Sequence, residues 1–346
     1  MSVIAFPNTK AIIRLWCNGS MWVSKTLGLG SSPRGRAQNK DERGNIIWIC
    51  KHFMINIAFY VALSVANKKV NGLRAVYILD EKEQRRRMKM VYEDQKKELV
   101  RLIRDSKHIV FFGGAGVSTE SGIPDFRSKD GLYNQHDVQF DQYSPEYLLS
   151  HTCLYHNPKV FFEFYRQKLD GRGIEPNITH ITLAELEKMG KNIDIVTQNI
   201  DGLHQKAGSK RVHEIHGTTQ RTYCTKCGME YHPDYIFNSK DTIPRCECGG
   251  MLRPDVTLYE EDLPKAAVNN AVEAISDADL LIIAGTSLIV YPANTFVSYF
   301  GGDHMVIVNR DAIDTSNLLF GYDDIFIQHS MGDVFQTVYD NLILSK

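Results

Sequence analysis

The 346-residue sequence has little of several things, and each shortage excludes a class of protein. Its seven cysteines are too few and too clustered for a disulfide scaffold, so a reducing compartment such as the cytoplasm is expected. Its formal net charge of -1 lacks the basic excess that sequence-independent nucleic-acid binding requires. Its only long apolar run, Phe53–Ala66, is shorter than a membrane span and lies too far from the N-terminus for an ordinary signal peptide. We therefore expect no nucleic-acid partner and no membrane.

Residues 1–87 do not share the pattern of the remaining chain. Residues 1–40 contain no aspartate or glutamate and show no sustained helical or strand period. An extension of this kind is typical of a targeting segment, or it results from a start site that was assigned too early. We favour a native start at Met88 or Met90, because Glu81–Arg87 is rich in residues with purine-rich codons, as a translated ribosome-binding site would be.

From Met90 onward, apolar strands alternate with amphipathic helices. Glu93–Asp105 has the apolar spacing of a surface helix, and Thr182–Met189 and Ala266–Ile275 predict two more. This alternation predicts an α/β fold with a doubly wound, parallel, Rossmann-like sheet. The strands are predicted over Ile109–Phe112, Ile193–Val196, Arg211–Ile215, Leu280–Ala284 and Met305–Val308.

A glycine-rich loop, Gly113–Gly116, follows the first predicted strand. Such a loop lets backbone N–H groups approach a pyrophosphate, so a dinucleotide is the first ligand to consider. The match to the dehydrogenase fingerprint is imperfect, because Thr119 stands where the third glycine would be. Polar residues also follow the other four strands, at 197–204, 216–217, 285–287 and 309–310. Because ligands bind beyond the carboxyl ends of such strands, these clusters predict one shared site.

Four cysteines form two close pairs, Cys224-x-x-Cys227 and Cys246-x-Cys248. This spacing predicts a tetrahedral zinc site with four thiolates, and glycines beside the pairs supply the tight turns. A closed site of this kind is structural, since it leaves no open position for chemistry.

These patterns divide the chain into an extension, a sheet domain and two inserted modules. Residues 88–127, 177–217 and 257–346 are expected to form the dinucleotide-binding domain. Residues 128–176 are expected to form a helical part of a small domain, and residues 218–256 a zinc-binding module.

From about Met90 to Lys346 the sequence resembles the sirtuins of bacterial type, which are NAD-dependent protein deacylases. The resemblance is carried by GAGVSTESGIPDFR at 114–127, TQNIDGLHQKAG at 197–208, EIHG at 214–217, RPDV at 253–256, GTSLIVYPA at 285–293 and VNR at 308–310, together with the paired cysteines. The motifs occur in the family's order, which makes their combination more specific than any one of them.

The resemblance implies a role for each matching residue. His216 would be the general base, and Asn199 and Asp201 would form the nicotinamide pocket with Ile200. Phe126 would shield the reactive carbon, and Gln198 would contact the nicotinamide ribose. The NAD contacts that it implies are Ala115, Ser118, Thr119, Phe126, Arg127, Gln198, Ile200, Asp201, His216, Thr286, Ser287, Asn309 and Asp333.

The implied reaction removes acetyl groups from lysine side chains of proteins and yields nicotinamide and O-acetyl-ADP-ribose. A histidine suits it, because a pKa near 6.5 permits proton transfer at neutral pH. Mono-ADP-ribosyl transfer is an alternative, since it uses the same cofactor cleavage with another acceptor. A non-catalytic NAD-binding module is a third possibility, although pure binding has no use for a base such as His216. The physiological target and the oligomeric state stay open.

The substrate peptide would bind as an added strand between Val256–Glu260 and Leu288–Tyr291. Here the chain departs from the family, because Glu260 stands in a glycine position. Together with the next two residues, 261 and 262, it forms an acidic cluster that predicts a preference for basic peptides. Tyr165 and Lys168, three residues apart, resemble the Tyr-x-x-Arg pair that binds acidic acyl groups, but lysine is a poor replacement for arginine. We therefore expect deacetylation first.

Overall fold

The computed structural model describes residues 81–126, 128, 131–134, 137–313, 318 and 324–345, with side chains from residue 90 onward. It also gives the backbone of five short strands nearer the start of the chain. The chain separates into two compact units, 1–76 and 77–346. The strands of the first unit pair antiparallel as β1-β2-β3 and β4-β5. They are β1 (Ile4–Ala5), β2 (Ile12–Cys17), β3 (Ser20–Lys25), β4 (Asn39–Lys40) and β5 (Ile46–Ile47).

Within the second unit, a six-stranded sheet has every neighbouring pair parallel, in the order β14-β13-β12-β6-β7-β8. This confirms the doubly wound, Rossmann-like fold predicted from the alternation of strands and helices. A strand beyond those predicted, β14, forms one edge. The strands are β6 (His108–Gly113), β7 (Asn192–Thr197), β8 (Val212–Glu214), β12 (Leu280–Ala284), β13 (His304–Asn309) and β14 (Ile325–Gln328).

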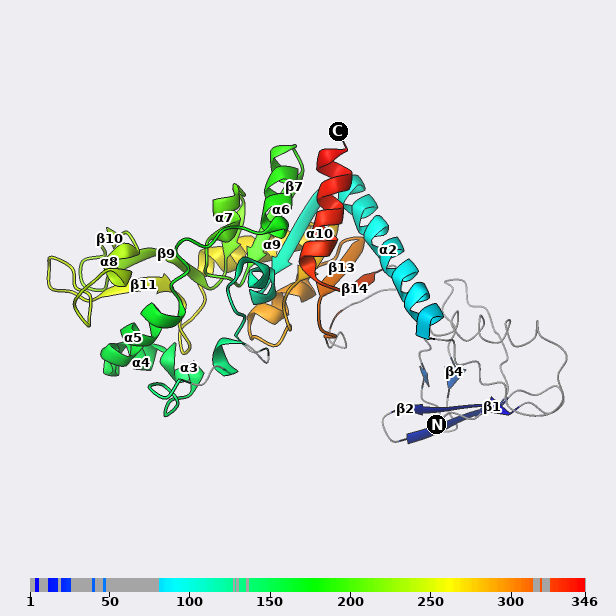
Figure 1. The fold of residues 1–346 in the computed structure, drawn as a ribbon, viewed down its shortest axis with the longest axis horizontal. Coiled ribbons are helices and arrows are strands. Elements are labelled where there is room, and N and C mark those ends of the chain that lie inside the picture. Colours follow the sequence, from blue (N-terminus) through cyan, green and yellow to red (C-terminus); the bar gives the residue numbers. More distant parts are fainter. Residues whose placement is uncertain are drawn as a thin grey trace. The chain divides into compact units, whose positions relative to one another are not determined.

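Helices cover both faces of this sheet, because its strands are apolar on both sides. Along β6, Ile109 and Phe111 face one buried cluster, while Val110 and Phe112 face the other. The first cluster includes residues of α2 (Glu81–Asp105), α6 (Ile178–Lys188) and α10 (Met331–Tyr339). The second includes residues of α9 (Lys265–Asp277) and the 3-10 helix η4 (Ala293–Tyr299). Figure 1 shows α2 and α10 beside each other at one end of this unit.

The direction of strand addition reverses between β6 and β12. The chain adds β7 and β8 on one side of β6, and β13 and β14 beyond β12 on the other. In open α/β sheets, this switch point is where ligands bind. The two loops that meet there are the glycine-rich loop after β6 and the Gly285–Ser287 segment after β12.

Two small modules lie together at the end of the unit away from α2 and α10 (Figure 1). The first is helical, with the 3-10 helix η3 (Leu132–Asn134), α3 (Pro145–Leu148), α4 (His151–His156) and α5 (Pro158–Lys168). The second is the antiparallel sheet β10-β9-β11, which carries the paired cysteines. Its elements are β9 (Gly217–Cys224), β10 (Glu230–Tyr231), α8 (Asp234–Phe237) and β11 (Leu252–Val256). A shared buried cluster, which includes Phe161, Tyr165 and Leu252, joins the two modules.

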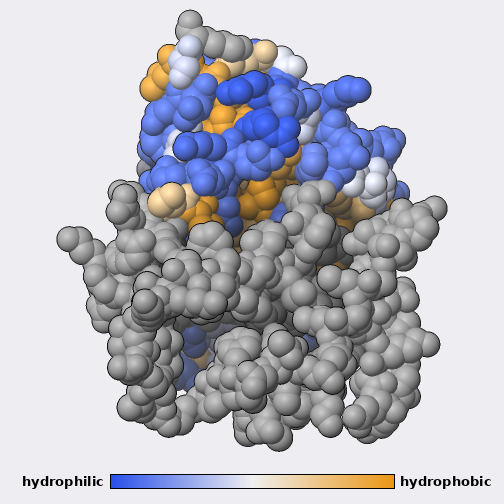
Figure 2. Space-filling model, turned by 90° about the vertical axis from the view of Figure 1, so that its right-hand side faces the viewer, coloured by the Kyte–Doolittle hydropathy of each residue, from blue (hydrophilic) through white to orange (hydrophobic). Residues whose placement is uncertain are grey.

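The remaining helices are short or terminal, and two of them follow strand ends. The 3-10 helices η1 (Ala115–Val117) and η2 (Thr119–Ser121) continue the glycine-rich loop, and α7 (Leu203–Ala207) follows β7. A π-helical turn, η5 (Asp340–Leu344), ends the described chain. On the face shown in Figure 2, hydrophilic residues cover most of the described surface, with apolar residues between them.

The first helix of the second unit begins earlier than the predicted start at Glu93. Helix α2 begins at Glu81 and runs through Met88 and Met90, so the predicted boundary after residue 87 falls inside a helix. The helix starts early because residues 81–92 are mostly Glu, Lys, Arg, Gln and Met, which favour helix without any apolar period. Strands β2 and β3 were also missed, although an Asn-Gly dipeptide, a hairpin signal, lies between them in the sequence. The apolar run Phe53–Ala66 lies outside the described residues.

Candidate active site

The glycine-rich loop packs directly on the loop after β12. Gly114 N donates to Ala284 O at 3.0 Å, and Gly116 N donates to Gly285 O at 2.8 Å. A Cβ atom on Gly114 would lie 2.7 Å from the Thr286 side chain, and one on Gly116 would lie 2.8 Å from Gly285 Cα. Only glycine permits this approach, so the two glycines are required for packing as well as for access to a phosphate.

Three hydrogen bonds that the sequence did not reveal also hold the glycine-rich loop and the two 3-10 helices that follow it. Asn177 is the N-cap of α6, and its Nδ2 donates to Val117 O at 2.8 Å and to Ser121 Oγ at 3.0 Å. At the start of α10, Gly332 N donates to Glu120 Oε1 at 3.0 Å. The loop is therefore held from α6 and α10 as well as from β12.

Ser118, Asn199 and Asp201 form a polar cluster at the ends of β6 and β7. Ser118 Oγ donates to Asp201 Oδ2 at 2.6 Å and accepts from Asn199 Nδ2 at 3.0 Å. The other carboxylate oxygen of Asp201 accepts from Leu203 N at 2.9 Å. Burial raises the pKa of Asp201, while the Ser118 hydrogen bond opposes that shift. Ser118 thus holds the carboxylate in place, a contact that the sequence did not predict.

His216 lies just beyond β8, on the same edge of the sheet. Its Nδ1 is 2.9 Å from Gln198 O. A carbonyl oxygen can only accept, so Nδ1 carries the proton and Nε2 keeps its lone pair. Burial lowers the pKa of His216, which keeps the ring neutral at pH 7. The residue therefore has the tautomer and charge state of a general base.

Other predicted cofactor residues lie at the ends of the sheet strands or in the segments that follow them. Gln198 Nε2 donates to Thr286 Oγ1 at 3.2 Å, which links the loop after β7 to the loop after β12. Thr119 Oγ1 donates to Gly116 O at 3.0 Å within the glycine-rich loop. Ala115 lies in η1, and the Phe126 ring packs edge-on against Tyr133. The carbonyl oxygen of Ile200 accepts from Thr219 N, and Asn309 Nδ2 donates to Asp311 O. Ser287 is exposed.

One predicted cofactor residue, Arg127, lies outside the described residues. Another, Asp333, has side-chain contacts on α2, where its carboxylate accepts from Tyr92 and from Lys96. These contacts use one carboxylate oxygen of Asp333, and its adenine contact stays a prediction.

The four cysteines of the zinc-binding module converge on one point. Cys224 Sγ lies 3.5 Å from Cys248 Sγ, and Cys227 Sγ lies 3.6 Å from Cys246 Sγ. All four sulfur atoms lie within 4.8 Å of one another. Zn–S bonds of about 2.3 Å at tetrahedral angles require S···S separations of about 3.8 Å, so this donor set fits zinc. Gly250 is needed beside them, because a Cβ atom there would lie 2.5 Å from Cys224 Sγ.

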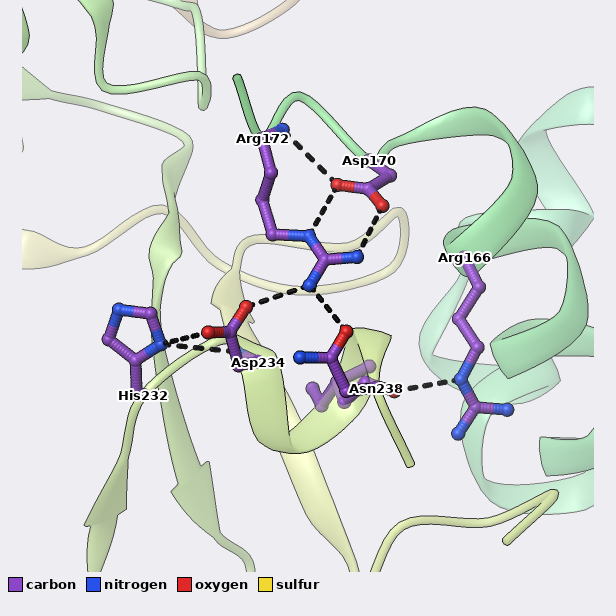
Figure 3. A network of polar contacts seen from close by, with 7 residues as sticks. Arg166, Asp170, Arg172, His232, Asp234 and Asn238 are labelled. Carbon is purple, nitrogen blue, oxygen red and sulfur yellow. Dashed lines mark hydrogen bonds and ion pairs between the residues drawn. The ribbon is translucent and has the colours of Figure 1, made fainter. Parts of the chain in front are cut away.

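Polar contacts fasten this module to the helical one (Figure 3). Arg166 of α5 donates to the carbonyl oxygens of Ile236, Asp241 and Thr242. Arg172 bridges Asp170 and Asp234, and its guanidinium lies 4.8 Å from the centre of the Phe237 ring. The two modules therefore share a polar fastening as well as a buried apolar cluster.

Two members of the acidic cluster at residues 260–262 have partners within the protein, and the preference for basic peptides stays a prediction. The Glu261 carboxylate accepts from both terminal nitrogens of buried Arg253, at 2.7 and 3.0 Å. Glu260 Oε2 accepts from Thr152 N at 2.8 Å. Each of these two carboxylates therefore has a partner within the protein, although Glu260, like Asp262, stays exposed to solvent.

Tyr165 and Lys168, which resemble the Tyr-x-x-Arg pair in sequence, do not pair in the structure. Tyr165 is 1 % exposed, and its ring stacks on Phe161 and Phe237. Lys168 Nζ instead lies 3.5 Å from Asp137 Oδ2. The two residues do not form a site for an acyl carboxylate, because one of them is a core residue.

Fold and site together define a dinucleotide-binding α/β protein with a structural metal module and a poised histidine. Comparison with known proteins agrees: the model of the Sir2 family matches residues 114–292. An NAD-dependent protein deacetylase of Clostridium acetobutylicum is 48% identical over 250 residues, which are 72% of this chain and 100% of the relative. One of Cutibacterium acnes is 49% identical over 245 residues, or 70% and 96% of the two chains.

Solved structures agree with these relatives. A Sir2 structure with a p53 peptide and NAD+ has a TM-score of 0.61 at 32% identity and covers 71% of this chain and 97% of its own. Another, with deacetylated p53 peptide and 3'-O-acetyl ADP ribose, has a TM-score of 0.63 at 32% identity, covering 71% and 98%.

The chain belongs to the Sir2 family. It is an enzyme of the NAD-dependent protein deacetylase kind, and NAD and zinc are the groups that its site and its cysteines fit. None of the helices that the structure describes is long and apolar enough to cross a membrane.

Proposed function

We propose that this enzyme removes acetyl groups from lysine side chains of proteins, with His216 as the general base. The observation that carries the assignment is the contact between His216 Nδ1 and Gln198 O, because it leaves Nε2 free to take a proton. A neutral, buried imidazole at the switch point of the sheet suits a base that acts on a ribose hydroxyl.

NAD, when bound, supplies a ribose carbon from which nicotinamide can leave. The chain's own residues would hold the nicotinamide and the ribose, the two groups joined by the bond that breaks. Asp201, kept in place by Ser118 and Leu203, would accept from the nicotinamide carboxamide, and Asn199 would complete the pocket. Phe126 would cover the sugar and exclude water, so that the acyl oxygen rather than water reacts.

The acetylated peptide would lie between Val256–Glu260 and Leu288–Tyr291 as an added strand. Support comes from the backbone: the only non-glycine residues with φ in the left-handed region, among those that the structure describes, are Glu260 at 74° and Leu288 at 53°. Strained backbone gathers at functional sites. A reducing compartment such as the cytoplasm is part of this proposal, since the zinc module needs its thiols.

The test is incubation of the protein with NAD and an acetylated peptide, with mass spectrometry of every product. We expect nicotinamide, O-acetyl-ADP-ribose and deacetylated peptide in equal amounts. ADP-ribose attached to protein, without loss of acetyl groups, would instead show the transferase alternative.

Replacement of the base is the second arm of this test. His216→Ala should slow deacetylation by roughly two to four orders of magnitude while zinc content and melting temperature stay near those of the wild type. His232→Ala, which removes an exposed histidine of the zinc module, is the matched control and should retain activity. A His216→Ala protein that deacetylates at nearly the wild-type rate would contradict the assignment.

A further inference from the structure

Glu260 has a backbone conformation that its side chain disfavours. Its φ is 74°, in the left-handed region where glycine is the usual residue. The resemblance to sirtuins also predicts glycine at this position. A residue held in such a conformation needs a contact that compensates for the strain.

The compensating contact lies at the first turn of α4. Glu260 Oε2 accepts from Thr152 N at 2.8 Å, and Ser150 Oγ, the N-cap, accepts from Cys153 N at 3.0 Å. The two side chains therefore satisfy two successive N–H groups that the helix itself leaves unpaired. Hydrogen bonds from Thr152, and the nearby His151, lower the pKa of Glu260, as expected for a carboxylate at the positive end of a helix.

The neighbouring backbone is tied to the same segment. Tyr259 N donates to Leu149 O at 3.0 Å, and His151 N donates to Tyr259 O at 3.0 Å, which makes a parallel bridge between Ser150 and Tyr259. The Tyr259 hydroxyl also lies 2.8 Å from the hydroxyl of Tyr133. The glutamate contact thus adds a side-chain fastening to a backbone junction between the sheet domain and the helical module.

The other end of this segment reaches the proposed base. Thr257 N donates to His216 O at 2.9 Å, and Leu258 N donates to Glu261 Oε2 at 2.9 Å. Residues 257–260 therefore run from the base to α4, held at both ends. Loss of the Glu260 contact would displace the end of the segment at α4, which is the end remote from His216.

We propose that Glu260 is a positioning residue, which fixes the peptide-facing segment 257–260 to the first turn of α4 so that the two form one preset wall of the peptide site. This inference rests on the peptide site proposed above. A glycine in the same place could adopt the backbone conformation without strain, but it could not make the contact with Thr152.

The test compares Glu260→Gly with Glu260→Gln in steady-state kinetics. Glu260→Gly should raise KM for the acetylated peptide by about tenfold, the effect of one lost charge-assisted hydrogen bond, while KM for NAD changes less than about twofold. Glu260→Gln keeps an oxygen acceptor for Thr152 N, so its KM for the peptide should stay near the wild-type value. Glu273→Gln, which removes an exposed charge on α9, is the control and should leave both constants unchanged.

Three outcomes would overturn the proposal. One is an unchanged peptide KM in Glu260→Gly, and another is a Glu260→Gln defect as large as that of Glu260→Gly. The third is a loss of kcat in Glu260→Gly while the KM values for the peptide and for NAD stay at their wild-type levels, because that pattern means only that a smaller fraction of the protein is folded.

Amide hydrogen exchange tests the contact without any activity. The Thr152 amide should exchange faster in Glu260→Gly than in the wild type and in Glu260→Gln, and equal protection in all three would refute the contact. A wild-type protein without NAD-dependent deacetylation would refute the proposed function, whereas the exchange experiment would still decide whether the contact exists.

Discussion

The buried pair His180 and His204 gives a prediction for stability at acidic pH. Their ring centres, on α6 and α7, lie 4.6 Å apart, and both residues are at most 1 % exposed. His180 Nδ1 accepts from Asn177 N, while its Nε2 has no hydrogen-bond partner among the described residues. Burial lowers the pKa of His180 to about 4. The folded protein therefore keeps this ring neutral at a pH where the unfolded chain would protonate it.

The sign and size follow from linkage. The unfolded state binds the proton near pH 6.5 and the folded state near pH 4, so the free energy of unfolding falls as the pH drops through this window. At pH 5.0 the loss from His180 alone is about 2 kcal/mol relative to pH 7.5, since each pKa unit corresponds to about 1.4 kcal/mol.

Urea unfolding of the wild type and of His180→Gln at both pH values measures this loss. Glutamine keeps an acceptor for Asn177 N and cannot titrate, so the variant should lose about 2 kcal/mol less than the wild type between pH 7.5 and pH 5.0. His204 is present in both proteins and contributes to both measurements. Parallel losses in the two proteins would show that the buried ring does not resist protonation, and the reasoning would be refuted.

Two further predictions concern the base and the metal. Because burial lowers the pKa of His216, the acid limb of the pH profile of kcat/KM should have its midpoint below the ordinary histidine pKa of about 6.5. A midpoint above that value would contradict the assignment. Cys246→Ala should lose stoichiometric zinc and melt at a lower temperature than the wild type, because a structural zinc site contributes folding free energy directly. Elemental analysis and a thermal melt check this. A wild-type protein purified without zinc would count against the site.

Most of the fold could be predicted from local pattern. Apolar strands such as Leu280–Ala284 and helices of period 3.6 are encoded by neighbouring residues, so their alternation was enough for a parallel sheet. The predicted ends of helices and strands were less accurate where helix propensity acted without a periodic pattern of apolar residues. Helix α2 begins at Glu81 for that reason, and the short strand β14 was missed.

The sequence by itself was enough to predict which residues carry the chemistry. A histidine after β8, an acid after β7 and two cysteine pairs are visible because strand ends and metal knuckles have short, fixed spacings. Only the tertiary structure decided how side chains distant in sequence are used. It placed Ser118 on Asp201 and Glu260 on Thr152, and it made Tyr165 a core residue. Such contacts depend on how loops and modules pack against one another, and no local period in the chain records that packing.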